Sequence, residues 1–265
     1  MVRRGTGALD DAVGPGDLLN PDVTYDRPPG GGDAIFDLVG DLAGKRVLDI
    51  GCGHAPYRDR LEKKGAVWTG LDLTGPACSV IGDGDQLPFR DEAFDAVFCA
   101  AVLEHIPEPD SIMSEMKRVL NNKGRIFGYV SFLEPMHGMS YFHMSHLGIE
   151  RLFFKHGFRP LTIFPARIGT AYQIECLLFP KSLPVLQPVV SALLQWSFAA
   201  AYWLNGAARS LYRSLSRRSP RADPADSGRD YRRLLALRFA VGFNFVAVRD
   251  DTARASRAGY RKLVK

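Results

Sequence analysis

The sequence predicts an α/β layered fold built around a largely parallel sheet, and two patterns carry this prediction. Short apolar runs, such as residues 47–50 and 94–102, have the length and unbroken hydrophobicity of buried strands. Amphipathic segments with helical spacing separate these runs, and alternating strands and helices imply right-handed crossover connections. The composition, 46% hydrophobic and 24% charged over 265 residues, is ordinary for a globular protein and excludes wholesale disorder, collagen and coiled coil.

The first half of the chain supplies four of the expected strands. Apolar residues at helical spacing between 35 and 42 predict a helix that Gly44 ends, and a second helix over 56–64 is closed by Gly65. The strands expected around these helices cover residues 47–50, 67–71, 80–81 and 94–102.

The second half is expected to add two helices and three strands. Asp110 suits the N-cap of an amphipathic helix over 112–120, and Gly157 ends a helix over 148–156. Strands are expected at 125–132, 161–164 and 238–248. Alternating apolar residues in the last strand predict that one of its faces is better buried than the other; they are Phe239, Val241, Phe243 and Phe245.

Four regions follow from these elements. Residues 1–32 are rich in Gly and Pro and are expected to form a flexible arm, with Tyr25 as the exception that docks on the body. The core is expected over 33–169 and 236–249. A helical, apolar and basic insertion over 170–235 separates the last two strands and is far longer than a normal loop, and a basic tail covers 250–265.

Charge is divided unevenly along the chain. Residues 1–180 carry 18 basic against 24 acidic side chains, whereas residues 181–265 carry 16 against 5. Such a basic region attracts polyanions, either nucleic acid or an anionic membrane surface. The four cysteines form no C-x-x-C pair, which excludes a disulfide scaffold and a cysteine-based zinc site, and no secretory signal opens the sequence. We therefore expect a cytoplasmic protein.

A glycine-containing turn follows the first strand. Gly51 and Gly53 stand where this strand gives way to a helix, so the backbone can approach a ligand closely. Asp72 ends the next strand about 20 residues later, where nucleotide-binding βαβ units place an acidic residue for ribose hydroxyls. The pattern predicts a nucleotide-type cofactor site.

The charge beside this turn decides between cofactors. A dinucleotide favours a third glycine where this chain has Pro56, and Asp49 would repel its pyrophosphate. The same carboxylate would attract the ammonium and sulfonium groups of S-adenosylmethionine, by roughly a few kcal/mol in a partly dry cleft. The sequence therefore favours S-adenosylmethionine, and a turn without a ligand is the alternative.

Six motifs in order carry a resemblance to a known family. They are VLDIGCG at 47–53, GLDL at 70–73, GDGDQLPF at 82–89, AFDAV at 93–97, VLEHI at 102–106 and MKRVL at 116–120. Over residues 35–165 the chain resembles the class I S-adenosylmethionine-dependent methyltransferases, particularly those similar to quinone-biosynthesis methyltransferases. The resemblance implies a Rossmann-like seven-stranded sheet whose last strand is antiparallel. The chain departs from the family where the insertion separates the last two strands.

The resemblance also implies which residues bind the cofactor. They are Asp49, Gly51, Cys52, Gly53, Asp72, Leu73, Asp83, Gly84 and Ala100. Asp49 and the backbone of 51–53 would hold the methionine end, Asp72 the ribose diol, and Asp83 the adenine amino group beside Gly84. Ala100 would lie under the sulfonium. Without the series of motifs, Asp83 would be interpreted as a turn former.

Histidines gather where an acceptor would bind. His105 follows the fourth strand, and His137, His143 and His146 follow the fifth. We expect one of His105, His137 and His143 to act as general base if the acceptor is a hydroxyl, with solvated or packing histidines as the alternative. The spacing H-x5-H-x2-H suggests a metal, but the segment holds no Cys or carboxylate at ligand spacing, so we expect none.

The insertion contains 27 consecutive uncharged residues, 182–208, followed by Arg209, Arg213 and Arg217. Large aromatic residues and a narrow stripe of Gln and Ser favour a helix lying in a membrane interface, with residues 182–218 as the contacting segment. A transmembrane span is disfavoured by Pro188 and the polar stripe. A lid or a dimer face that buries the same aromatic residues remains open.

These observations predict methyl transfer from S-adenosylmethionine to a small-molecule or lipid-linked acceptor, with peripheral attachment to the inner face of the membrane as one option. The sequence Cys99-Ala100-Ala101 at the end of the fourth strand disfavours methylation of DNA bases. O-, N- and C-methylation remain open. A non-catalytic membrane adaptor with a cofactor pocket and an RNA methyltransferase using the basic tail are the alternatives.

Overall fold

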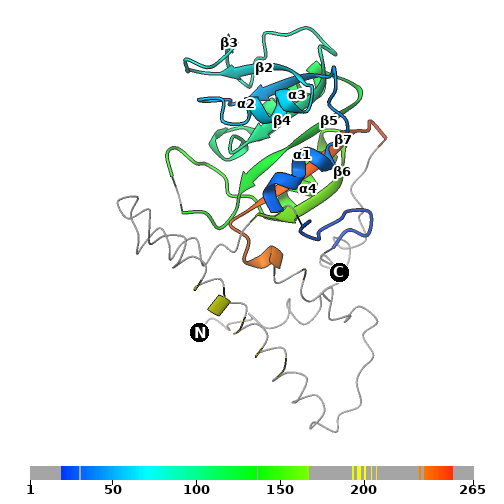
Figure 1. The fold of residues 1–265 in the computed structure, drawn as a ribbon. Helices are drawn as coiled ribbons and strands as arrows, with labels where there is room; N and C mark the ends of the chain where they lie inside the picture. Colours follow the sequence, from blue (N-terminus) through cyan, green and yellow to red (C-terminus); the bar gives the residue numbers. More distant parts are fainter. Residues whose placement is uncertain are drawn as a thin grey trace, which may run out of the picture.

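The computed structural model describes residues 19–29, 31–135, 137–166 and 236–252, together with isolated positions between 193 and 233. Its centre is a seven-stranded sheet with the strand order β3-β2-β1-β4-β5-β7-β6 (Figure 1). The strands are β1 Arg46–Ile50, β2 Val67–Asp72, β3 Val80–Ile81, β4 Phe94–Ala100, β5 Leu120–Ser131, β6 Phe158–Pro165 and β7 Gly242–Arg249.

Strand direction confirms the predicted sheet. The pairs among β1 to β5 are parallel, whereas β7 pairs antiparallel with both β5 and β6. Strands β6 and β7 are neighbours although residues 166–241 separate them in the chain, so the insertion leaves and returns at one end of an antiparallel pair. Positions 193, 196, 197, 200, 204 and 207 within the insertion are helical, and the rest of the predicted helix lies outside the described residues.

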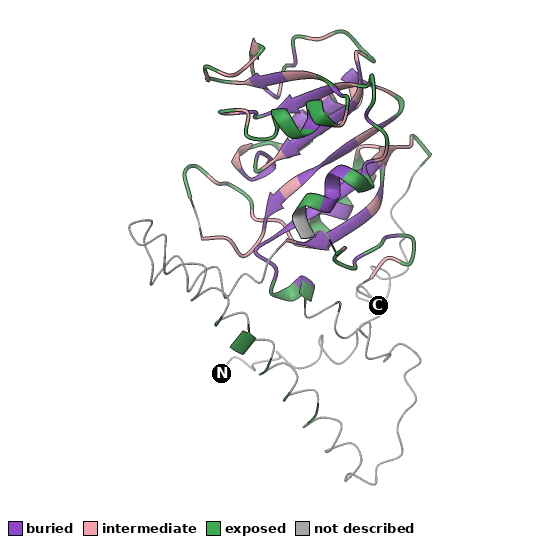
Figure 2. Ribbon diagram, in the orientation of Figure 1, coloured by how far each residue is buried: buried purple, intermediate pink, exposed green. Residues whose placement is uncertain are grey.

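Helices cover both faces of the sheet. They are η2 Gly31–Ala34, α1 Ile35–Leu38, α2 Arg58–Lys63, η3 Leu103–His105, α3 Pro109–Val119 and α4 His146–Lys155. Helices α1 and α2 share an apolar cluster with Val47 of β1, and α3 and α4 share another with Leu48. Since successive strand residues point to opposite faces, the two clusters are the two layers of the core. Figure 2 shows β1, β4, β5, β6 and β7 buried along most of their length, whereas β3 and the start of β2 at the edge of the sheet are intermediate or exposed.

Several predicted boundaries change. Helix α1 ends at Leu38, because Gly40 has a φ of +94°, so the expected extension to 42 and the stop at Gly44 are wrong. Helix α3 begins at Pro109 after Glu108, which replaces Asp110 as N-cap; the Asp110 carboxylate instead contacts Lys155 and His156. Pro109 suits this first position since its missing N–H would have no partner there.

The last strand is also shorter and more buried than expected. It begins at Gly242, and Phe239 lies outside it with 46% of its surface exposed. Residues 242–247 are all buried on both faces, because β7 is an interior strand between β5 and β6. The predicted difference between its two faces is therefore wrong.

The described part of the N-terminal region packs on the core. Tyr25 is buried, as predicted, and its hydroxyl donates a hydrogen bond to Glu150 of α4. Docking extends beyond this residue, since Val23 is buried and Thr24 forms a bridge with Thr162 of β6. Residues 1–18 lie outside the described residues.

The described helices include none that is both long enough and apolar enough to cross a membrane.

Candidate functional site

The glycine turn after β1 has a backbone that only glycine fits at its first position. Gly51 has a φ of +69°, and a Cβ atom there would lie 2.3 Å from Cγ2 of Val102. The buried loop after β4 therefore packs directly on the turn. Parallel pairing of β1 with β2 brings the end of β2 alongside, where the Gly53 N–H donates to Asp72 Oδ2 at 2.8 Å. The carboxylate predicted to bind ribose thus already contacts the turn.

Asp49 is a buried acidic residue near the end of β1, just before the glycine turn. Its carboxylate is 2% exposed and accepts a hydrogen bond from Trp68 Nε1 at 3.1 Å. Burial raises the pKa of Asp49 to about 7; the negative charge of Asp72 adds to this rise, and the Trp68 bond opposes it. A cationic ligand placed beside Asp49 would favour the ionised form, as the choice of S-adenosylmethionine requires.

The segment after β3 carries the other predicted cofactor residues. Asp83 is exposed and its Oδ1 accepts from the backbone N–H of Asp85, so it does form a turn, and Gly84 is buried against Ile112. Leu73 is 63% exposed beyond the end of β2. Both Asp83 and Leu73 are therefore accessible to a ligand.

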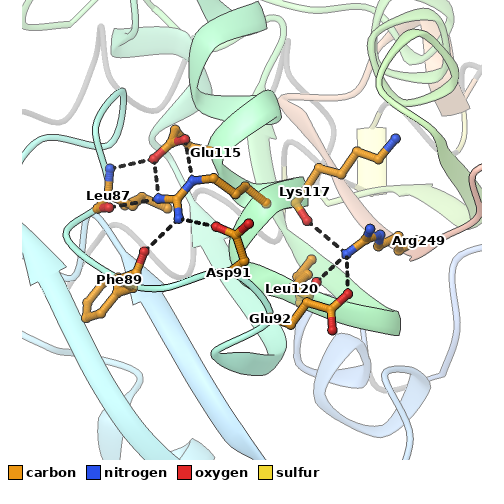
Figure 3. A network of polar contacts seen from close by, with 9 residues as sticks. Leu87, Phe89, Asp91, Glu92, Glu115, Lys117, Leu120 and Arg249 are labelled. Atoms are coloured by element: carbon orange, nitrogen blue, oxygen red, sulfur yellow. Dashed lines mark hydrogen bonds and ion pairs between the residues drawn. The ribbon is translucent and has the colours of Figure 1, made fainter.

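Arg118 of α3 holds this segment in place, and Figure 3 shows its partners Leu87, Phe89, Asp91 and Glu115. Its guanidinium donates to the carbonyl oxygens of Leu87 and Phe89 at 2.9 and 2.7 Å, and forms ion pairs with Asp91 and Glu115. Glu115 in turn accepts from the Leu87 N–H at 2.8 Å. The segment that follows the predicted adenine contact is thus anchored to the core helix.

A cavity of about 300 Å³ opens next to Ala100, at the carboxyl end of β4. Its lining includes Asp33, Phe36, Tyr57, Phe98, Ala100, Tyr129, Glu134 and Asn244. Tyr129 and Asn244 face each other across the β5–β7 ladder, and the Tyr129 hydroxyl donates to Glu134 at 3.2 Å. The Asn244 amide nitrogen is buried without a partner among the described residues. The cavity therefore combines aromatic walls with a few polar groups.

Sequence reasoning missed Tyr129, Glu134 and Asn244, because they come from segments that only the sheet brings together. One signal was present: Asn244 is a polar residue within the otherwise apolar stretch 243–248. A buried amide in such a strand requires a partner, and a bound ligand can supply one.

The three predicted base histidines do form one cluster. The ring centroids of His105 and His137 lie 5.2 Å apart, and those of His137 and His143 lie 6.3 Å apart. None of them is among the described residues that line the cavity. His146 lies elsewhere and packs against Tyr25 and Phe243.

A hydrogen-bonded link runs from the cavity wall to Glu104, which lies beside His105 and His137. Ser131 Oγ lies 2.6 Å from Glu104 Oε1 and 2.6 Å from Glu134 Oε2. Glu104 immediately precedes His105, and Glu134 is on the cavity wall. The carboxyl groups of Glu104 and Glu134 therefore share the hydroxyl of Ser131 as a hydrogen-bond partner.

Comparison with known proteins identifies the fold. Residues 48–128 match the methyltransferase domain family. The ubiquinone biosynthesis O-methyltransferases of Nitrosomonas europaea and Dechloromonas aromatica are 31% and 33% identical over 109 and 108 residues; each match covers 35% of this chain and 46% or 47% of the relative. The chain thus matches about half the length of these curated relatives.

A solved structure gives the same fold. The 1,6-didemethyltoxoflavin-N1-methyltransferase of Burkholderia thailandensis, in complex with 1,6-didemethyltoxoflavin and S-adenosylhomocysteine, aligns with a TM-score of 0.50 and 13% identity over 83% of this chain and 77% of that one. The fold is therefore the one that the motif series predicted, that of the class I S-adenosylmethionine-dependent methyltransferases. The match to the methyltransferase domain family, residues 48–128, contains most of these motifs.

Proposed function

We propose that the protein transfers a methyl group from S-adenosylmethionine to a small-molecule or lipid-linked acceptor. The observation that carries this proposal is Asp49, a buried carboxylate at the glycine turn. Burying an acid costs free energy unless its charge is compensated, so the position is explained by a ligand that brings positive charge. Both the ammonium and the sulfonium of the cofactor meet this need.

The residues of the site supply alignment and a water-poor environment. When bound, the cofactor supplies a methyl group on a positively charged sulfur, which is already activated for displacement. Asp49 and the backbone around Gly51 would hold the methionine end, and Asp72 the ribose. Ala100 lines the cavity and ends β4, the strand that pairs with β1, which leads into this turn. An acceptor bound in the cavity would then lie next to the methyl group. Alignment of this kind contributes several kcal/mol to catalysis.

The cavity favours a flat acceptor. Phe36, Tyr57 and Phe98 supply aromatic surface, and the rings of Tyr57 and Phe98 are 5.0 Å apart in an edge-on arrangement. Asn244 can donate a hydrogen bond to an acceptor oxygen, and Glu134 can accept one from a hydroxyl. We therefore propose a planar hydroxylated or carbonyl-bearing acceptor, a chemical class that includes the substrates of quinone methylation.

The proton of a hydroxyl acceptor needs a base. Glu134 is at the cavity wall and is linked through Ser131 to Glu104, which lies beside His105 and His137. We propose that the acceptor proton leaves toward this chain of groups. Replacing His105, His137 and His143 by Ala, one at a time, tests whether a histidine takes part: unchanged turnover in all three variants would eliminate that role.

Calorimetry of cofactor binding tests the central claim. We expect the full chain to bind S-adenosylmethionine and S-adenosylhomocysteine, and Asp49→Asn to weaken binding of the cationic cofactor by about 10- to 100-fold. Asp59→Asn, at an exposed position on α2, is the matched control and should bind as the wild type does. Absence of binding to the wild type, or equal binding by the two variants, contradicts the proposal.

Transfer of labelled methyl groups into extracts identifies the acceptor. Lipid and polar extracts of the host are incubated with the protein and with its Asp49→Asn variant. Label that appears in the lipid fraction only with the wild type supports a lipid-linked acceptor. Cofactor binding without transfer to any fraction would favour a non-catalytic membrane adaptor. Transfer to RNA would favour an RNA methyltransferase.

We further propose that residues 182–218 attach the protein to the inner face of the membrane. The described helical positions in this segment include Leu193, Trp196 and Leu204, exposed at 64%, 77% and 60%. Spacings of three and eight residues place these three side chains on one side of a helix. Flotation with vesicles containing anionic phosphatidylglycerol tests this: the full chain should float, and a variant lacking 182–218 should not. Equal behaviour of the two would remove the membrane proposal.

A further inference from the structure

We propose that Glu104, His105 and His137 bind a divalent transition-metal ion, with His143 as a neighbouring fourth group. One possible ligand atom of each of the first three residues lies within 4.8 Å of the others. The sequence analysis expected no metal, because the histidine segment itself holds no carboxylate at ligand spacing. The missing carboxylate comes from η3, which precedes that segment by about thirty residues and is brought to it by the fold.

Glu104 is the strongest evidence for a cation. The residue is 0% exposed, and its Oε1 accepts from Ser131 Oγ at 2.6 Å. The second carboxyl oxygen, Oε2, is buried without a hydrogen-bond partner among the described residues. A buried oxygen of this kind is costly to leave unpaired, and a metal ion would satisfy it.

The hydrogen bonds of the three histidines occupy Nδ1 and leave Nε2 available as a metal ligand. Nδ1 of His105, His137 and His143 lies 3.3, 3.0 and 3.1 Å from the backbone carbonyl oxygens of Met139, Pro135 and Phe132. A carbonyl oxygen only accepts, so each Nδ1 carries a hydrogen, and in the neutral imidazole that binds metals each Nε2 presents a lone pair. Metal-binding histidines are commonly oriented by such a bond on their other nitrogen.

His143 adds a second unpaired atom. Its Nε2 is buried and has no hydrogen-bond partner among the described residues, and its ring lies 6.3 Å from that of His137. In its neutral form the imidazole has no hydrogen on this nitrogen, so it cannot satisfy the unpaired carboxylate oxygen of Glu104. A positively charged ion would accept electron density from both.

The backbone holds the two ligand segments together. The N–H groups of Tyr141 and Phe142 donate to the Glu104 carbonyl oxygen at 2.6 and 3.3 Å. This ties the loop after β5 to η3 independently of the ligand side chains. Bonds of about 2.0–2.2 Å to a metal would require the ligand atoms to draw closer by roughly an ångström, within reach of side-chain rotation.

The ligand set selects the kind of metal. Two or three imidazoles with one carboxylate suit Zn²⁺, and also Fe²⁺, Mn²⁺ or Co²⁺, whereas Mg²⁺ and Ca²⁺ prefer oxygen ligands throughout. Three protein ligands would leave an open coordination position. Its use toward an acceptor oxygen, through the link from Glu104 by Ser131 to Glu134, rests on the proposed function, whereas the metal site itself does not.

Metal binding is tested on the full chain without an affinity tag. The protein is dialysed against a chelator and titrated with ZnCl₂ by calorimetry, and bound metal is counted by mass spectrometry. We expect one Zn²⁺ per chain. His137→Ala and Glu104→Gln should each weaken binding at least about 100-fold. His54→Ala, an exposed histidine outside the cluster, is the control and should bind as the wild type does.

Substitution with Co²⁺ provides a second readout. Visible absorption bands should appear on binding to the wild type and to His54→Ala, and should be lost in His137→Ala. Circular dichroism establishes that each variant is folded, and His137→Ala decides the outcome if Glu104→Gln does not fold. No stoichiometric metal in the wild type, or equal affinity of His137→Ala and His54→Ala, would overturn the proposal.

The two proposals fail separately. S-adenosylhomocysteine binding, measured on the metal-free protein, reports only on the cofactor site. Metal binding that persists without cofactor binding would leave the metal site standing and reject the methyltransferase proposal. Cofactor binding without metal uptake would reject the metal site and leave the methyltransferase proposal standing.

Discussion

At the scale of single residues, the buried carboxylate of Asp49 lowers the stability of the protein when no cofactor is bound. Asp49 has a pKa of about 7 against its ordinary value of 3.8, because burial disfavours its charge. Its contribution to the free energy of unfolding is therefore complete below about pH 4 and is lost as the pH rises toward 7. Above pH 7 the folded protein holds a buried negative charge that a cationic cofactor would compensate.

Replacing Asp49 by Asn should separate stability from binding. At pH 8 we expect Asp49→Asn to raise the free energy of unfolding, by up to about 4 kcal/mol, because no charge is buried. At pH 4 the two proteins should be nearly equally stable. Urea denaturation at both pH values measures this difference. An Asp49→Asn variant that is less stable than the wild type at pH 8 would contradict the origin assigned to the raised pKa.

Gly51 and Gly44 have nearly the same backbone conformation but different surroundings, so substitutions at the two positions can be compared. Gly51→Ala places a Cβ atom 2.3 Å from Val102 at a φ of +69°, whereas Gly44 has nearly the same φ, +68°, and nothing within 4 Å of such an atom. We expect Gly44→Ala to cost about 1 kcal/mol in unfolding free energy, and Gly51→Ala clearly more, with weaker cofactor binding. Thermal and urea denaturation compare them. Equal losses would show that backbone conformation alone requires glycine at position 51.

At the scale of elements, helix α3 connects the core to the loop between β3 and β4. Its inner residues Ile112, Met113 and Met116 are fully or almost fully buried, while Arg118 on the same helix donates to carbonyl oxygens of that loop (Figure 3). Arg249 of β7 makes a similar bond to the carbonyl of Leu120, the residue that follows the C-terminal end of the same helix. The packing of one helix thus positions the loop expected to contact adenine.

Removing the Arg118 side chain should loosen this loop. Arg118→Ala removes the hydrogen-bond donor of two carbonyl oxygens and the ion-pair partner of Glu115, so we expect the free energy of unfolding to fall by about 1–3 kcal/mol. Amide hydrogen exchange over 82–91 should quicken, and cofactor affinity should decrease. Arg90→Ala, an exposed arginine of the same loop, is the control. Exchange rates that are the same in both variants would show that Arg118 does not restrain the loop.

At the scale of the whole molecule, the insertion is topologically separable from the sheet. Pro165 near its start pairs with Phe243 near its end, as partners in the β6–β7 ladder. Antiparallel strands need only a short turn to connect them. The sheet therefore does not depend on the insertion for its connectivity, which leaves this segment open to a separate role at a membrane.

Shortening the insertion should preserve the core. We expect a variant in which a short Gly-Ser linker replaces residues 170–232 to retain its far-ultraviolet circular dichroism, its cooperative unfolding and its cofactor binding. Binding to anionic vesicles should be lost, in line with the flotation experiment. A variant that unfolds would show instead that the insertion covers part of the core, as a lid would.

The sequence by itself determined the strand series and the glycine turn with Asp49 and Asp72, because these depend on local periodicity and on the short βαβ unit that carries them. The seven-stranded class followed from the resemblance of the six motifs to a known family. The boundaries of α1 and β7 depended on tertiary context: a positive φ at Gly40 ends the helix, and two flanking strands bury both faces of β7. The tertiary structure alone decided that Tyr129 faces Asn244 and that Glu104 joins the histidines. Such groups meet because distant segments of the chain pair across the sheet, and residue spacing along the sequence does not predict these contacts.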